Sequence, residues 1–216
     1  MIKYFTIYGE RCSGTNFLEK TISENLNVSV HYDFNWKHFF GFYNFINIEK
    51  ENETLFIGIV KEPIEWINSL FRDLHHIPSE NRINIDAFLL NEFYSIEDNK
   101  EIMEDRNMIT KKRYSNIFEL RKVKNDFLIN KIQKLVKNYV LIKYEDLCNN
   151  HDNVLDYICT NFNIQKKNNP YVKIIKYKGK ENYNYKRKEI QIESDKIEII
   201  KKSLDKEQEK ILGYEI

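Results

Sequence analysis

Apolar residues along the chain fall into short runs that alternate with segments of helical periodicity. The first run, residues 3–8, is rich in aromatic and β-branched side chains, and Gly9 ends it. From Thr15 to about Leu26, apolar residues recur three and four positions apart, which predicts an amphipathic helix. A nearly continuous apolar run at 54–60 is typical of a strand that is buried on both faces of a parallel sheet.

The same alternation continues toward the carboxyl terminus. Further strands are expected at 27–32 and 139–143, and a short strand at 171–177. More helices are expected in the segments that begin at Pro63 or lie within 85–94, 114–137, 151–162 and 193–212, the last with a break at 203–205. Strands that alternate with helices predict an α/β fold with a mostly parallel central sheet flanked by helices.

The length of the chain fits a single domain over residues 1–216. Because 42% of the residues are hydrophobic, such a domain can bury a substantial core. Residues 75–112 are charged, contain Pro78 and have a mixed pattern. We therefore expect an insertion at 75–112.

Charge and cysteine content argue against several classes of protein. Lys and Arg number 34 and Asp and Glu 33, a balance that does not favour a nucleic-acid partner or a membrane-surface protein. No apolar run approaches the ~18 residues of a membrane-spanning helix, and residues 1–10 have the pattern of a strand rather than of a signal peptide. The three cysteines are an odd number without metal-ligand spacing, so we expect reduced thiols, a cytoplasmic protein and no metal site.

A glycine-flanked turn follows the first strand. Gly9 and Gly14 are separated by four residues, and the first helix begins at Thr15. Such a turn lets backbone N–H groups converge, and the helix N-terminus adds partial positive charge, so the motif predicts a phosphate or sulfate site. An ATP-type loop would continue with Lys and Ser or Thr, whereas this chain has Thr15 and Asn16, and a turn without a ligand is the alternative.

A second motif follows the buried strand at 54–60. It consists of Lys61, Pro63 and, eight positions after the lysine, Ser69. The carboxyl ends of parallel strands are where α/β sheets bind ligands. The lysine and the serine are therefore candidate ligands of an anion.

These two motifs resemble those of sulfotransferases that use 3′-phosphoadenosine 5′-phosphosulfate (PAPS). Residues Gly9–Leu18 are similar to the 5′-phosphosulfate loop of that family, and Lys61–Ser69 is similar to its 3′-phosphate motif. His38–Phe40 resembles a His-Phe-Phe run of heparan-type members, Tyr144–Leu147 a Tyr-Glu-Asp-Leu run of the superfamily, and Lys178–Gly179 its carboxyl-terminal Lys-Gly loop.

The resemblance implies a three-layer P-loop-type fold and a metal-independent reaction with PAPS as co-substrate. The acceptor would be a hydroxyl or amine of a sugar, a small alcohol, a lipid head group or a protein tyrosine. The residues that it assigns to the nucleotide are Arg11, Cys12, Ser13, Gly14, Thr15, Asn16, Lys61, Ser69, Lys178 and Gly179.

The chain departs from the family pattern at both anion motifs. Cys12 stands where the family has a basic residue, and Lys61 stands where Arg is usual. Arg11, one residue earlier, could supply the missing charge to the sulfuryl group, or could point away from it. In the second case the protein would be a weak or inactive enzyme.

Three residues are expected to carry the chemistry. His38 is the candidate general base, because a histidine titrates near neutral pH, and Lys37 and Arg11 are the candidate cations for the moving sulfuryl group. The alternative for His38 is a structural place in an aromatic core cluster with Trp36, Phe39 and Phe40.

Other polar residues have two interpretations each. Arg121, Lys124 and Asn125 share a helix face that would either reach over the sulfuryl group or be solvated. His75 and His76 would line the acceptor site or belong to a surface loop, and Glu145 and Asp146 would be metal ligands or a helix cap.

Two other functions compete with sulfuryl transfer. One is a nucleoside or nucleotide kinase with a degenerate P-loop, which the pair Thr15–Asn16 disfavours because it lacks the phosphate-binding lysine. The other is a non-catalytic nucleotide-binding protein of the same fold, which Cys12 supports.

Overall fold

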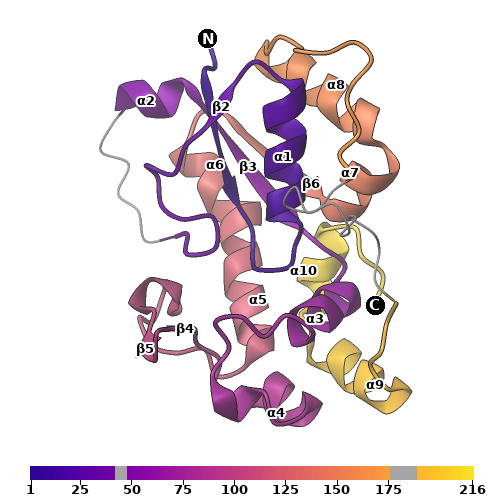
Figure 1. Cartoon of the computed structure of the whole chain (residues 1–216). Helices are drawn as coiled ribbons and strands as arrows, with labels where there is room; N and C mark the ends of the chain where they lie inside the picture. Colours follow the sequence, from indigo (N-terminus) through magenta and orange to yellow (C-terminus); the bar gives the residue numbers. More distant parts are fainter. Residues whose placement is uncertain (42–47, 176–188) are drawn as a thin grey trace.

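A four-stranded parallel sheet lies at the centre of the computed structural model, which describes residues 1–41, 48–175 and 189–216, and helices flank it (Figure 1). The strands lie in the order β2-β1-β3-β6, and all three neighbouring pairs are parallel. Their bounds are Tyr4–Tyr8 for β1, Ser29–Val30 for β2, Thr54–Val60 for β3 and Tyr139–Lys143 for β6. The predicted α/β class and parallel central sheet are confirmed.

The strand β3 is the most deeply buried element. It pairs with β1 on one side and β6 on the other, and all seven of its residues are buried, as its apolar run predicts. In this register Tyr8 of β1 lies opposite Gly58, so β1 and β3 end at the same edge of the sheet. The segments that follow these two strands are therefore neighbours.

One face of the sheet is covered by α1 (Thr15–Asn25), α7 (Tyr144–Asn149) and α8 (His151–Phe162). Side chains alternate along β1, so that Phe5 and Ile7 point into this core. The short helix α7 begins directly at the end of β6 and was not predicted.

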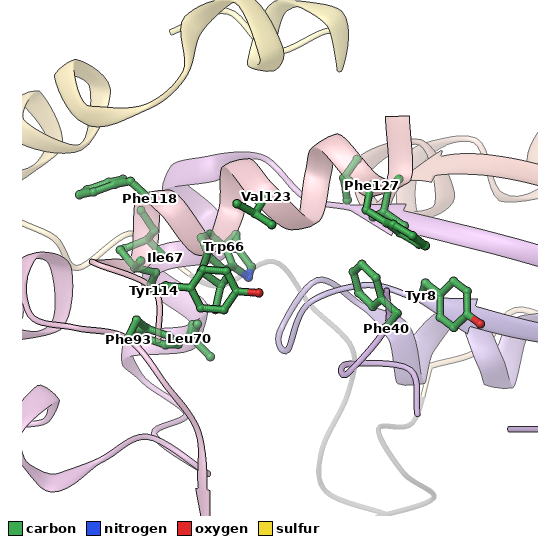
Figure 2. Packing of buried hydrophobic residues seen from close by; sticks show 14 of the residues in the cluster. Tyr8, Phe40, Trp66, Ile67, Leu70, Phe93, Tyr114, Phe118, Val123 and Phe127 are labelled. Carbon is green, nitrogen blue, oxygen red and sulfur yellow. The ribbon is translucent and has the colours of Figure 1, made fainter. Parts of the chain in front are cut away.

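The other face carries a larger core. Helices that contribute to this core are α3 (Pro63–Phe71), α4 (Ile85–Leu90) and α5 (Ile117–Asp126), and α5 continues through a π-helical turn at Phe127–Lys131 into α6 (Ile132–Leu135). The chain ends in α9 (Ser194–Ser203) and α10 (Lys206–Ile211), with the predicted break between them. Figure 2 shows Tyr8, Phe40 and Phe127 gathered on one side of this core and Trp66, Tyr114 and Phe93 on the other.

Two predicted helix boundaries were wrong. The helix expected from 114 begins at Ile117, because the Asn116 side chain accepts from the N–H groups of Phe118 and Glu119 at 3.0 Å and caps it. The helix expected to 94 ends at Leu90, since Phe93 exchanges two backbone hydrogen bonds with Tyr114.

Two strands are shorter than expected or absent. The strand expected at 27–32 covers only Ser29–Val30. Residues 171–175 form no strand, because the Asn25 side chain bonds both the N–H of Val172 at 2.7 Å and its carbonyl at 2.9 Å; residues 176–177 lie outside the described part of the chain.

The segment 75–112 packs against the larger core through α4. It also contains a hairpin of β4 (Ile96–Glu97) and β5 (Lys100–Glu101) and two 3₁₀ turns, Ser79–Asn81 and Met103–Asp105; before β3, a short helix α2 spans Ile48–Asn52. Within the described residues, no helix has both the length and the apolar character needed to cross a membrane.

Candidate functional site

The order of the strands creates a switch point between β1 and β3. From β1 the chain crosses to β2 on one side, and it then returns to β3 on the other side of β1. In open α/β sheets the crevice at the carboxyl ends of two such strands is the usual ligand site. The loop 9–14 follows β1 and residues 61–63 follow β3, so both sequence motifs border this crevice.

The loop 9–14 presents backbone N–H groups at the start of α1. Its turn is fixed by Gly14, which has a φ of 99°, and by a hydrogen bond of 3.1 Å from the N–H of Ser13 to the carbonyl of Glu10. Among the described residues, the N–H groups of Gly14, Thr15 and Asn16 have no acceptor. Together with the helix dipole, they form the kind of site that binds a phosphate or sulfate group.

Gly14→Ala is expected to destabilise the protein by about 1–3 kcal/mol. A Cβ atom at Gly14 would lie 2.3 Å from Cδ2 of Tyr144, and the left-handed backbone adds strain. Urea unfolding measures the loss. The matched control is Gly213→Ala, where φ is also positive but the new atom meets only the end of the Lys143 side chain at 3.3 Å. Equal losses in the two variants would show that contact with Tyr144 is unimportant.

The structure brings Lys61 and Ser69 together. The Lys61 ammonium donates to the Ser69 hydroxyl at 2.9 Å, and the two side chains are only 7% and 5% exposed. The same ammonium lies 4.7 Å from the centre of the Tyr144 ring, the ring that packs on Gly14. Tyr144 therefore connects the two sequence motifs in space.

A pocket of about 320 Å³ opens beside Tyr144. This volume is within the range of small-molecule sites, about 300–1,000 Å³. The aromatic rings of Phe17 and Tyr144 meet edge to face in its wall, with centroids 6.2 Å apart. The pocket is lined by α1, α3, α7, the start of α8 and residues 173–175. The lining residues are Phe17, Glu65, Tyr144, Glu145, Leu147, Cys148, Asn149, His151, Lys173, Ile174 and Ile175.

His38 is held with Nδ1 bonded, and Nε2 has no hydrogen-bond partner among the described residues. Its Nδ1 lies 2.8 Å from the carbonyl oxygen of Gly9. Because a carbonyl only accepts, the proton is on Nδ1, and Nε2 keeps its lone pair. Burial lowers the pKa of His38 to about 4, with Arg11 and Lys37 acting in the same direction, so the imidazole is neutral at pH 7.

The aromatic neighbours of His38 do not form one core cluster with it. Phe40 is buried and stacks on Tyr8, with ring centroids 5.4 Å apart. Trp36, in contrast, is 44% exposed and its ring lies edge to face with His38. The core-cluster alternative is therefore wrong for Trp36.

The side chain of Lys37 reaches the first turn of α1. Its ammonium donates to the Asn16 side chain at 2.7 Å and to the Glu19 carboxylate at 2.9 Å. The candidate catalytic residue Lys37 and the candidate nucleotide ligand Asn16 are thus in contact at the start of the helix, and His38 contacts the loop 9–14 through Gly9.

Arg11 is bound to carboxylates and is buried. Its guanidinium lies 3.1 Å from Glu10 and 3.5 Å from Asp105, and it also donates to the carbonyl of His75. This arrangement matches the second alternative for Arg11, in which its side chain points away from the sulfuryl group and toward carboxylates of the protein. Burial opposes ionisation of Glu10, but Lys124 and Arg11 outweigh it and lower the pKa of that carboxyl to about 2.

The polar face of α5 is not solvated. Arg121, Lys124 and Asn125 are all buried, which overturns the solvated-face alternative. Arg121 forms a two-point ion pair with Glu209 at 2.5 and 2.7 Å. Lys124 donates to Glu10 at 2.5 Å and to Asp105.

The remaining candidates lie at the edge of the site or outside it. Cys12 is half-buried, 3.9 Å from the Asp73 carboxylate. Glu145 accepts from the N–H of Glu62 at 2.9 Å and from the Tyr214 hydroxyl at 3.0 Å, which ties α7 to the start of α3. Residues Lys178 and Gly179 lie outside the described part of the chain.

Two further histidines were candidates for the acceptor site. The rings of His75 and His76 pack on each other with centroids 3.7 Å apart, and Nδ1 of His76 bonds the carbonyl of Ile96 at 2.8 Å. Among the described residues, no group of three or more His, Cys, Asp or Glu side chains has the arrangement of a metal site.

Comparisons of the chain with models of protein families, with curated proteins and with solved structures found no match. The geometry therefore carries the functional argument. It combines an uncapped helix N-terminus, the pair of Lys61 and Ser69, a pocket lined by Phe17 and Tyr144, and the neutral imidazole of His38.

Proposed function

We propose that the chain is a sulfotransferase of P-loop-type fold, which moves a sulfuryl group from PAPS to a hydroxyl or amine of an acceptor. The observation that carries this proposal is the contact of 2.9 Å between Lys61 and Ser69 beside the loop 9–14. A nucleotide with anions at both its 3′ and 5′ positions needs two anion sites. The start of α1 and the Lys61–Ser69 pair would supply two such sites, and both motifs contact Tyr144.

The pocket beside Tyr144 would hold the nucleoside. Its volume of about 320 Å³ suits a base and ribose, and Phe17 and Tyr144 offer aromatic surface for the base. Burial raises the pKa of the Tyr144 hydroxyl, so that this ring stays neutral next to a phosphate. Nucleotide specificity would then depend on side chains of α1 and α7.

His38 would act as the general base. Its Nε2 takes the proton of the acceptor hydroxyl as the acceptor oxygen bonds to sulfur and the bond from sulfur to the 5′-phosphate oxygen breaks. The electron pair of the broken bond leaves with adenosine 3′,5′-bisphosphate. Lys37 and the N–H groups of Gly14 and Thr15 would stabilise the negative charge on the transferred group and on the departing phosphate.

A non-catalytic nucleotide-binding protein is the second candidate. The pairing of Arg11 with Glu10 and Asp105 favours it, because the loop then offers backbone N–H groups without a side-chain cation. Titration calorimetry with adenosine 3′,5′-bisphosphate, compared with ATP and Mg²⁺, tests nucleotide binding. Turnover of PAPS with a panel of sugar, alcohol, lipid and tyrosine acceptors tests catalysis. Tight bisphosphate binding without any turnover would favour the non-catalytic protein.

Nucleotide binding is expected to be independent of metal. Thr15 and Asn16 replace the residues that bind Mg²⁺ and phosphate in ATP-type loops, and the proposed anion ligands are N–H groups, Lys61 and Ser69. The affinity for adenosine 3′,5′-bisphosphate should be the same with and without EDTA. A loss of about tenfold, ~1.4 kcal/mol, would contradict a metal-free site.

A further inference from the structure

Lys124 of α5 carries a buried ammonium group that the proposed mechanism does not use. Its side chain is 2% exposed, so it has no access to a substrate. The ammonium donates to Glu10 at 2.5 Å, to Asp105, and to the backbone carbonyl of His38 at 2.8 Å. Because an ammonium has three N–H donors, these three acceptors saturate it and fix its position.

The three acceptors come from three separate segments. Glu10 belongs to the loop 9–14, the proposed phosphate loop. Asp105 belongs to the segment 75–112, and His38 belongs to the segment after β2. Two more hydrogen bonds join the first and the last of these, from the N–H of Gly9 to the carbonyl of Lys37 at 3.0 Å and from Nδ1 of His38 to the carbonyl of Gly9. The candidate base is thus tied to the loop through its ring and to Lys124 through its backbone.

The charges around Lys124 balance. Glu10 and Asp105 face Lys124 and Arg11, two carboxylates against two cations, and all four residues are buried. Burial disfavours the charged form of Lys124, but Asp105 and Glu10 outweigh it and raise its pKa. The ammonium therefore keeps all three protons at neutral pH.

We propose that Lys124 is a positioning residue for the general base, which holds His38 against the phosphate loop so that Nε2 stays unprotonated and available. The catalytic meaning of this inference rests on the proposed function, whereas the placement of the imidazole does not. Lys124 contacts the backbone of the base and the side chain of the loop, and it does not contact the reacting groups.

The test uses a charge-balanced double variant, Lys124→Met with Asp105→Asn. It removes one cation and one carboxylate, and it leaves Glu10 paired with Arg11. The matched control is Lys122→Met with Asp205→Asn, an ion pair of 2.8 Å from the same helix in which Lys122 is exposed. The cap at Asp205 survives in the control, because Asn is also a good N-cap.

The readout is the tautomer of His38, followed by the ¹⁵N chemical shifts of its ring. We expect the proton on Nδ1 alone in the wild type and in the control, and a mixture of both tautomers in the Lys124→Met, Asp105→Asn variant. Turnover of that variant should fall by about tenfold to a hundredfold, with the affinity for adenosine 3′,5′-bisphosphate unchanged.

A double variant that keeps both the Nδ1 tautomer and its turnover would overturn the inference. If that variant does not fold, Lys124→Arg is measured in the same way, since its planar guanidinium keeps the charge but not the tetrahedral set of three bonds. A wild type without turnover would overturn the proposed function, and the tautomer measurement would still decide the role of Lys124.

Discussion

Replacement of His38 by alanine is expected to lower turnover by ~10²–10⁴, the usual contribution of a positioned general base. The reason is the state of its ring. Nδ1 donates to the carbonyl of Gly9, and Nε2 is left with its lone pair. Binding of adenosine 3′,5′-bisphosphate should stay nearly unchanged, because the proposed nucleotide ligands are Lys61, Ser69 and the start of α1.

Two companion variants define what would contradict this prediction. His38→Gln should be as slow as His38→Ala, since an amide takes up no proton. His76→Ala removes another histidine whose Nδ1 bonds a backbone carbonyl, and it should keep its turnover. If His38→Ala retains more than about a third of the turnover while His76→Ala loses it, the base is His76.

The lowered pKa of His38 predicts the pH dependence of the reaction. Because protonation near pH 4 removes the lone pair, turnover should be level at neutral pH and fall only as the pH approaches about 4. The same shift affects stability. An unfolded histidine titrates near 6.5, so folding loses free energy as the pH falls from about 6.5 to 4, and this loss should disappear in His38→Ala.

Features encoded by local patterns were predictable from the sequence. The run at 54–60 is apolar at nearly every position, and it forms the buried strand β3. Lys61 and Ser69 follow it at a spacing that a strand and a two-turn helix bring together, so their contact could be expected from the sequence. The turn at Gly14 before Thr15 also depends only on neighbouring residues, so it was predictable in the same way.

Features that depend on distant partners were not predictable. The sequence places Lys124 on a charged helix face, but its burial depends on Glu10, 114 positions away, and on Asp105, which lies in a segment without clear periodicity. Arg121 is paired with Glu209, 88 positions away. The pattern of charges along a helix does not specify whether its cations face water or pair with a carboxylate that is distant in the sequence.

The pocket is a second feature of this kind. Phe17 and Tyr144 are 127 positions apart, and each has an ordinary place in its own element, the first turn of α1 and the start of α7. Only the parallel pairing of β1, β3 and β6 places these two rings at one edge of the sheet. The sequence signals for Tyr144 were its position directly after an apolar strand and the resemblance of Tyr144–Leu147 to a run of the sulfotransferase superfamily.

Lys61→Ala is expected to weaken the binding of adenosine 3′,5′-bisphosphate by roughly 10- to 150-fold. Loss of a charged hydrogen-bond partner costs about 1.5–3 kcal/mol, and Lys61 would supply that partner to the 3′-phosphate. AMP, which lacks this phosphate, should bind almost as well to the variant as to the wild type. Titration calorimetry with both ligands measures the difference, and an equal loss for both would show that Lys61 does not recognise the 3′-phosphate.

Two further substitutions separate recognition of the phosphate from support of the Tyr144 ring. Lys61→Met keeps an unbranched side chain near the ring but has no charge, so it should lose bisphosphate affinity as Lys61→Ala does. Lys61→Arg keeps the charge and offers two parallel N–H donors, so it should bind the bisphosphate at least as well as the wild type. If Lys61→Met binds the bisphosphate normally, the lysine only supports Tyr144, and the 3′-phosphate is held by other residues.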